Sequence, residues 1–427
     1  MLNNAALQFV DGVFLARESM ESLEASLPAS MLALVVTGFF QSVVAYSGTF
    51  VAQYSGAGNP EGVRKSYAAG TAIAFAAGLL AVAAIPLGLA VAPLTSSNPE
   101  VVERARSYYT IVSFGSFALC GQMAAASYFT GLGFVRIVFW TNLGGNLFNA
   151  ALDPILIFGL AGAPRLGISG AAYATVAAMA LQWAVLAFAA SRTRRPVAAA
   201  GAAGDVPFWP LAGKILRYGI PSGAYSTLNV LSFTIFVFAT ARAGEIAFAA
   251  SNACFKVNYL LIAPMEGFAV AAATLVGRHQ GRGDSGAARR DTLKTLFLGL
   301  VLVTALSLLA LVFHRPVLSM FAPEGAASEE FHSLGFTLFA IMAAWQIFDA
   351  ADVIVSGALK GAGDTRFVFL WMVVSAFGFW LPLVWLVSET HPTMPALWGT
   401  MVAYVIFICG GTLLRFLRGS WRRHKLV

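Results

Sequence analysis

The chain has 427 residues, of which 58% are hydrophobic and only 11% are charged. Soluble domains carry about 25% charged residues, so this composition excludes an ordinary soluble globule and indicates a polytopic membrane protein. The net charge of +7 would suggest nucleic acid binding in a soluble protein. Here most Lys and Arg residues flank hydrophobic segments, so membrane topology explains them and we expect no nucleic acid partner.

Twelve segments are apolar over most of the roughly 20 residues that a membrane-spanning helix needs. They cover residues 1–16, 31–52, 68–90, 111–132, 137–160, 168–190, 216–240, 246–276, 296–313, 331–359, 367–387 and 394–416. Most of the 27 basic residues follow even-numbered segments, so the positive-inside rule predicts that both termini are cytoplasmic. We therefore expect a multi-pass protein of the inner or plasma membrane, in contact with the lipid bilayer.

The first of these segments is short for a spanning helix. Ten residues precede Asp11, and as a helix they reach roughly 15 Å, about half of the membrane core. No basic residue precedes Asp11 to anchor the cytoplasmic end of such a helix. We therefore expect that the first helix is truncated here and that the native chain begins upstream of Met1.

Two motifs of the first half recur in the second half. The segment VAQYSGAGNPEGVRKS at 51–66 matches VGRHQGRGDSGAARRD at 276–291, and GLGFVR at 131–136 matches GAGDTR at 361–366. Each copy follows an even-numbered segment, and the two copies of a motif lie six segments apart. The two halves therefore have the same orientation in the membrane, as expected for repeats related by an axis along the membrane normal.

These observations predict the fold class and the domains. We expect an all-α protein of twelve transmembrane helices, arranged in two six-helix bundles with a pseudo-two-fold axis along the membrane normal. Residues 1–190 form the predicted N-lobe and residues 211–427 the predicted C-lobe. Residues 191–210 are rich in Ala, Gly, Pro and Arg and form the predicted cytoplasmic linker.

The segment NLFNAALDPILIFG at 146–159 is the most informative part of the chain. Asn149 and Asp153 lie four residues apart, and therefore on one helix face. A carboxylate inside a membrane costs roughly 2.5 to 3.5 kcal/mol on insertion scales, so it normally faces a water-filled path or a partner. Pro154 removes a backbone donor, so we expect a bend and a carbonyl of Ala150 without its helical partner. Such oxygens suit Na⁺, or equally a proton.

Asp11 and Thr175 complete the candidate cation-coupling site of the N-lobe. Two carboxylates without a basic residue among these segments repel each other unless a proton or a metal ion neutralises them. If the ion is Na⁺, the candidate ligands are Asp11, Asn149 and Asp153. The alternative is a structural polar cluster that joins the helices. Apart from bound Na⁺ or H⁺, we expect no cofactor.

The second half has a polar site of its own. Asp349 and Asp352 in WQIFDAADVIVSGALKG are three residues apart and share a helix face. Lys256 is the predicted counter-charge of this pair, and Glu266, which follows Pro264, is a further candidate. A buried Lys–Asp pair without a transport role is the alternative, because neutralising a buried charge is reason enough for a partner.

Aromatic residues in the apolar segments offer ring faces for flat organic cations through cation–π contact. The alternative for each ring is ordinary packing or contact with lipid. The candidates for the wall of a substrate cavity are Phe40, Tyr46, Tyr225, Phe233 and Trp345.

Several motifs together carry a family resemblance. They are VDGVFLAR near the start, YSGAGNPEGVRKS after the second segment, TGLGFVR, NLFNAALDPILIFG and LGISGAAYATV. Along nearly its whole length the chain resembles multidrug and toxic compound extrusion (MATE) transporters. The resemblance implies two six-helix bundles in a V shape, which export organic and often cationic compounds in exchange for protons or sodium ions.

The resemblance also implies roles for single residues. Asp11, Asn149, Asp153 and Thr175 match the N-lobe cation site of the family, and Asp349 matches its acid on helix 10. In GIPSGAYSTLN, Asn229 stands where some members carry a glutamate on helix 7. The C-lobe polar site would then comprise Asn229, Lys256, Asp349 and Asp352.

We therefore predict a cation-coupled antiporter, driven by H⁺ or Na⁺, that exports small organic cations by alternating access and acts as a monomer. The alternatives are a lipid-linked oligosaccharide flippase of the wider superfamily and a non-transport integral membrane protein. A flippase would need several cationic residues in the first-half segments to hold a pyrophosphate, and these segments lack them. The five histidines lie scattered without metal-ligand spacing, so we expect no enzymatic activity.

Overall fold

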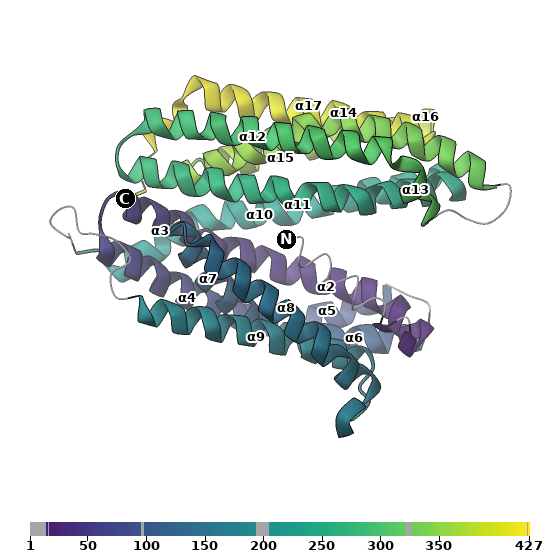
Figure 1. The fold of residues 1–427 in the computed structure, drawn as a ribbon, viewed down its shortest axis with the longest axis horizontal. Coiled ribbons are helices and arrows are strands. Elements are labelled where there is room, and N and C mark those ends of the chain that lie inside the picture. The colour runs from purple at the N-terminus through teal and green to yellow at the C-terminus, as the bar shows by residue number, and fades with distance from the viewer. Residues whose placement is uncertain (1–13, 16, 95–97, 194–204, 322–326, 425) are drawn as a thin grey trace. The chain divides into compact units, whose positions relative to one another are not determined.

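The computed structural model describes residues 14–15, 17–94, 98–193, 205–321, 327–424 and 426–427, and this part of the chain is helical, without strands (Figure 1). The first-half helices are α2 (Met20–Ala45), α3 (Ser47–Gly56), α4 (Pro60–Ala83), α5 (Ile85–Val91), α6 (Pro99–Phe114), α7 (Ser116–Gly131), α8 (Val135–Phe158) and α9 (Ile168–Arg192). The second-half helices are α10 (Phe208–Thr240), α11 (Glu245–Gly281), α12 (Ser285–Val312), α13 (His314–Ser319), α14 (Ala327–Ala362), α15 (Thr365–Val373), the π-helical η4 (Val374–Trp380), α16 (Leu381–Thr390) and α17 (Met394–Arg418).

The predicted spans after the first each coincide with one described helix or with two or three helices in succession. Eight described helices are long and apolar enough to cross a membrane, or nine if α6 and α7, which meet at 47°, count as one span. The first predicted span lies almost entirely outside the described residues. The all-helical architecture expected from hydropathy is therefore confirmed for the described chain.

Two helices begin well before their apolar segments. The side chain of Ser19 caps α2 by accepting a hydrogen bond from the N–H of Ser22 at 3.1 Å. Asn98 caps α6 in the same way through the N–H of Glu100 at 3.0 Å. The first turns of both helices are polar, so hydropathy alone places the starts too late, whereas the capping residues mark them.

The chain divides into two compact units, which we describe separately. The N-terminal unit ends at Gly223, and the C-terminal unit covers Ala224–Leu426. This boundary lies inside α10, beyond the predicted linker at 191–210. A Cβ atom at Gly219 or Gly223 would lie 2.9 Å from a backbone oxygen of α2. Glycine at these two positions therefore lets the first part of α10 pack closely on the N-terminal unit.

Four glycine turns confirm the internal repeat. In each turn the glycine N–H donates to the carbonyl three residues earlier at 2.8 to 3.3 Å, and the next N–H donates to the carbonyl five residues earlier at 2.8 to 3.0 Å. This pattern is the Schellman C-cap, which needs a positive φ angle and so favours glycine. The glycines are Gly58, Gly133, Gly283 and Gly363, with φ of 66°, 75°, 75° and 96°.

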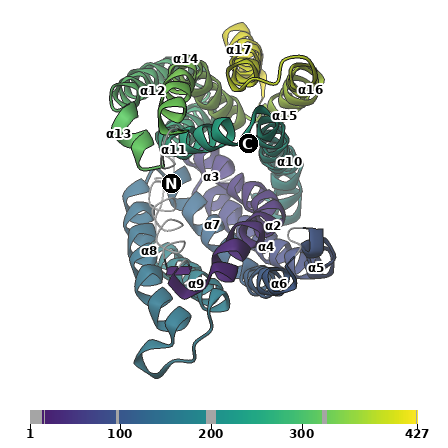
Figure 2. The same ribbon diagram turned by 90° about the vertical axis from the view of Figure 1, so that its right-hand side faces the viewer.

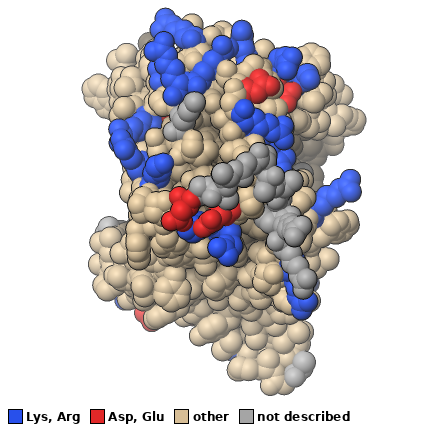
Figure 3. Space-filling view, turned by 90° about the vertical axis from the view of Figure 1, so that its left-hand side faces the viewer, with Lys and Arg blue, Asp and Glu red and all other residues tan. Residues whose placement is uncertain are grey.

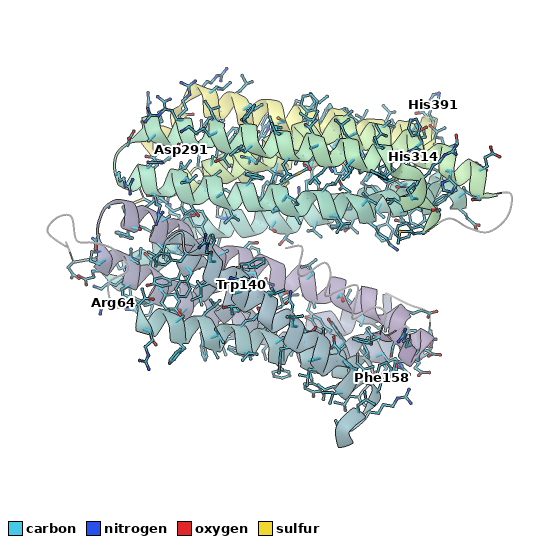
Figure 4. All side chains as sticks on the ribbon, in the orientation of Figure 1. Arg64, Trp140, Phe158, Asp291, His314 and His391 are labelled. Carbon is cyan, nitrogen blue, oxygen red and sulfur yellow. The ribbon has the colours of Figure 1, made fainter. Side chains whose placement is uncertain are left out.

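Basic residues follow all four glycine turns, and we call the end of each unit where these turns lie the basic end. Figure 4 labels Arg64 and Asp291 near this end, and Phe158, His314 and His391 at the opposite end. Figure 3 shows many Lys and Arg side chains and few Asp and Glu side chains on the face that it views. The positive-inside rule predicts that this end is cytoplasmic.

The core of the C-terminal unit is aromatic. Trp398 lies between Trp345 and Phe255, with centroid distances of 4.9 Å to both rings. Trp380, at the end of η4, stacks on Tyr404 at 4.5 Å. The indole N–H groups of Trp398 and Trp380 donate to side-chain hydroxyls at 3.0 and 3.2 Å, so their polar atoms are satisfied. This core holds α10, α11, α14 and α17 together (Figure 2).

Candidate functional site

A polar track runs along one face of α8 in the N-terminal unit. Its members recur at intervals of four, three and four residues: Asn142, Asn146, Asn149 and Asp153. The amide nitrogen of Gln122 on α7 donates to Asn142 at 3.1 Å, and that of Gln182 on α9 donates to Asn146 at 3.4 Å. Hydrogen-bonded amides therefore line this face of α8 up to the position of Asn149 and Asp153.

The structure brings three of the four predicted N-lobe residues together. With the Asn149 amide oriented to suit both neighbours, its nitrogen donates to Oδ2 of Asp153 at 3.3 Å and its oxygen accepts from the backbone N–H of Thr175 at 3.1 Å. Asn149 and Asp153 are both 0% exposed. The Thr175 hydroxyl donates to the carbonyl of Ala171 at 3.0 Å, so this residue contributes its backbone to the trio. Asp11 lies outside the described residues.

Small residues bring α8 and α9 close enough for this contact. A Cβ atom at Gly170 of α9 would lie 2.6 Å from the carbonyl oxygen of Leu156, and one at Gly145 of α8 would lie 2.2 Å from the amide of Gln182. Helices in membranes approach closely where such small residues line the interface. The α8 helix also runs without interruption through Pro154.

Metal binding by this site stays a prediction. Within the described ranges, no three side chains of His, Cys, Asp or Glu come together as ligands for a metal ion. The predicted Na⁺ ligands include Asp11, which lies outside those ranges. The described part of the site offers the carboxylate of Asp153 and the amide of Asn149, donors that suit a proton or a hard cation.

The C-terminal unit contains a second polar site on α14. The hydroxyl of Thr412 on α17 donates to Oδ1 of Asp352 at 2.7 Å, and Asp352 is 4% exposed. Asp349 lies within electrostatic range of Asp352 and of Glu266 on α11. Tyr404 of α17 is within electrostatic range of both aspartates. Its side chain is only 6% exposed, and its hydroxyl has no hydrogen-bond partner among the residues that the structure describes.

The predicted counter-charge of this site is wrong. Lys256 is exposed, and its ammonium lies over the ring of Phe321, 4.9 Å from the centroid, not beside Asp349 or Asp352. The buried face of α11 includes Asn258, and two residues along a helix correspond to a rotation of about 200°. Lys256 therefore points away from the face that packs on α14.

The counter-charge in the structure is Lys360. Its ammonium lies 3.7 Å from the ring centroid of Tyr225 and within electrostatic range of Asp352 and Glu266. Sequence reasoning assigned Lys360 only to the positive-inside pattern. A usable signal was present, because Asp352, Ser356 and Lys360 recur every four residues along one face of α14.

Other predicted residues lie in packed surroundings. Asn229 accepts a hydrogen bond from the Ser232 hydroxyl with its backbone carbonyl at 2.9 Å. Among the candidate cavity rings, Trp345 is 2% exposed and belongs to the aromatic core, and Tyr46 is 4% exposed. Phe233 packs edge-on against Phe255 at 5.0 Å, and Phe40 packs against Phe39 at 5.4 Å. Among the five candidate rings, the described contacts place Tyr225 against the ammonium of Lys360, in the polar site of the C-terminal unit.

Sequence reasoning missed a charged cluster at the end of the N-terminal unit opposite the basic end. The Glu18 side chain is 8% exposed and accepts hydrogen bonds from Ser22 at 2.6 Å, Arg104 at 3.3 Å and Arg165 at 3.2 Å. Burial by itself raises the pKa of this carboxyl, but the hydroxyls of Ser22 and Ser19 and the two guanidinium groups outweigh burial and hold the pKa below its usual value of 4.5.

This lowered pKa predicts a pH-dependent stability. The contribution of Glu18 is complete above about pH 4.5 and is lost as the pH falls through the lower folded-state pKa. Glu18→Gln should cost about 1 to 3 kcal/mol at neutral pH and should flatten the acid limb of a melting curve recorded in detergent. Glu103→Gln is the control, because that carboxylate is 76% exposed and pairs weakly with Arg106. An acid limb identical in Glu18→Gln and the unmodified protein would contradict the assignment.

Comparison with known proteins places the chain in a family. A family model described as MatE matches residues 1–155 and 221–386, one segment in each half of the repeat. The chain belongs to the MatE family. The resemblance to MATE transporters inferred from the motifs is therefore confirmed.

Several relatives of this MatE protein cover nearly its whole length. The probable multidrug resistance protein NorM of Bradyrhizobium diazoefficiens is 28% identical, over 99% of this chain and 91% of that protein. The multidrug resistance protein MdtK of Edwardsiella ictaluri is 21% identical, over 98% of this chain and 92% of that protein.

A solved structure of a multidrug resistance MATE family transporter in an outward-facing conformation superposes with a TM-score of 0.88 at 17% identity, covering 100% of this chain and 94% of that one. A MOP superfamily transporter from Pyrococcus furiosus superposes with a TM-score of 0.87, also at 17% identity, covering 100% and 94%. The MATE fold, with its helices in two bundles, is thereby confirmed.

Proposed function

We propose that this MatE protein is a multidrug efflux transporter that exports organic cations in exchange for H⁺ or Na⁺. The observation that carries the proposal is Asp153, a carboxylate with 0% exposure inside the 24-residue helix α8. Ionisable residues at such positions are costly and generally mark ion or substrate pathways. The relatives are named multidrug resistance proteins, and this supports drug-like compounds as the substrate class.

Coupling follows from the charge state of this site. When Asp153 takes up a proton or binds Na⁺, the charge between α8 and α9 changes by one, and the contact with Asn149 changes with it. An ion that favours one arrangement of these helices disfavours a substrate that needs the other. Linkage makes this effect reciprocal, which is the requirement for exchange.

The charges of the C-terminal unit favour a cationic substrate. Asp349 lies within electrostatic range of Asp352 and Glu266, and both of these also interact with Lys360. Among the described residues, Lys360 is the one basic side chain in this cluster of three carboxylates. The described polar track of α8 carries amides and a carboxylate, not the basic residues that a pyrophosphate-linked lipid would require. Both observations favour export of cations over the flipping of lipid-linked oligosaccharides.

The test is uptake of ethidium into inside-out membrane vesicles that contain the full chain. Dye should accumulate when the vesicle interior is made acidic, or when Na⁺ is placed inside, and the effective gradient identifies the coupling ion. The membrane potential is clamped with valinomycin and equal K⁺ on both sides, because a cationic dye also responds to potential. Uptake no greater than in vesicles without the protein, under either gradient, would refute the proposal.

A further inference from the structure

Lys360 occupies an unusual position for a lysine near a helix end. It lies in the last turn of α14, at the basic end, where long basic side chains normally extend toward water. Instead, Lys360 is partly buried and its ammonium lies 3.7 Å from the ring centroid of Tyr225 on α10. Helix side chains lean toward the N-terminus of their helix, which directs this ammonium back along α14 into the unit.

The groups around this ammonium are those that recognise an organic cation. Tyr225 presents its ring face, and Asp352 and Glu266 lie within electrostatic range of both Tyr225 and Lys360. An aromatic face flanked by carboxylates is the usual environment for a bound ammonium or quaternary ammonium group. The cation present here is a side chain of the protein itself.

The cluster also has an excess of negative charge and a hydroxyl group available for hydrogen bonding. Three carboxylates, those of Glu266, Asp349 and Asp352, are accompanied by the single ammonium of Lys360 among the described residues. The buried Tyr404 hydroxyl lies within electrostatic range of both aspartates and has no hydrogen-bond partner in the described part of the chain. The site therefore has both the charge and the free hydrogen-bonding capacity to accept a positively charged ligand.

We propose that Tyr225, Asp352 and Glu266 form a subsite for the ammonium or quaternary ammonium group of a substrate, and that Lys360 occupies this subsite as a tethered cation when substrate is absent. A substrate cation must displace the Lys360 ammonium, so Lys360 lowers the affinity for every cation that binds there. A neutral compound cannot replace that charge, so Lys360 also selects for cations. The inference rests on the proposed function, because it names how the C-terminal unit binds the exported cation.

Equilibrium binding of tetraphenylphosphonium to the purified full chain in detergent tests this subsite without any ion gradient. Lys360→Met should bind the probe about tenfold more tightly, since the competing cation is gone. Lys360→Arg should bind within about threefold of the unmodified protein, because guanidinium also stacks on an aromatic ring. Lys256→Met is the matched control, an exposed lysine of the same unit outside the cluster, and should bind as the unmodified protein does.

Substitutions of Tyr225 separate a cation–π subsite from a general change in charge. In the Lys360→Met background, Tyr225→Phe should keep the tighter binding, whereas Tyr225→Ala should remove most of it. A gain that survives Tyr225→Ala in full would reflect net charge alone and would overturn the subsite.

Loss of Lys360 leaves the carboxylates of the cluster, of which Asp352 is buried, without their counter-charge, so a folding control is included. Lys360→Met with Glu266→Gln restores the charge balance and should bind the probe more tightly than Glu266→Gln alone. Equal affinity of these two proteins, or absence of probe binding to any of the folded variants, overturns the inference. Tighter binding by Lys360→Met combined with no gradient-driven uptake would instead count against ion coupling and leave the subsite standing.

Discussion

Asp153→Asn is expected to reduce gradient-driven efflux more than tenfold while the protein remains folded. The substitution keeps the size of the side chain and an oxygen that accepts from Asn149, but removes the group that takes up a proton or binds Na⁺. Substrate exchange without a gradient should persist, because the helices that carry the site remain packed. The measurement compares ethidium uptake driven by an imposed gradient with counterflow at equal ion concentrations.

The control for this prediction is Asp205→Asn. It makes the same chemical change at a carboxylate that is 84% exposed and pairs with Lys65 at the surface, where ion pairs contribute little. Its uptake should match that of the unmodified protein. Full gradient-driven uptake by Asp153→Asn at normal expression would remove Asp153 from the coupling mechanism.

Gly361→Ala is expected to destabilise the C-terminal unit by about 3 kcal/mol, near the upper end of overpacking effects. A Cβ atom there would lie 2.3 Å from the carbonyl oxygen of Ala273, and the same change at Gly357 would place it 2.5 Å from the carbonyl oxygen of Ala269. These contacts are with backbone, so α11 and α14 must move apart. Thermal unfolding in detergent should show a clearly lower melting temperature for either variant.

Gly267→Ala is the matched control on α11. Apart from the adjacent backbone of α11, no atom of the described chain lies within 4 Å of the Cβ position at Gly267, and alanine is favoured over glycine inside a helix by about 1 kcal/mol. Its melting temperature should stay constant or rise slightly. If Gly361→Ala melted at the same temperature as Gly267→Ala, the close approach of α11 and α14 would not limit stability.

The features that sequence reasoning predicted correctly depend on local pattern. Hydropathy over about 20 residues identifies a spanning helix whatever its neighbours are. The spacing of Asn149 and Asp153 places both side chains on one face of a single helix. Each of these inferences needs only the residues of one segment.

The partners of charged groups were predictable only in part, because a partner lies on another helix. The four-residue repeat of Asp352, Ser356 and Lys360 was available in the sequence, but the ring of Tyr225 comes from α10 and Glu266 from α11. Lys256 and Asn258 are near neighbours in the chain, yet they point to different sides of α11. The packing of α11 on α14 therefore decided which lysine meets the carboxylates.

By itself the sequence determined the helical spans, the internal repeat, the basic ends and the shared face of Asn149 and Asp153. Only the tertiary structure decided that Thr175 meets Asn149 through its backbone and that Glu18 binds Arg104 and Arg165. The reason is physical. Hydropathy and helix periodicity act along one segment, whereas the pairing of buried charges depends on the rotation and separation of neighbouring helices, and glycines at their contacts set that separation.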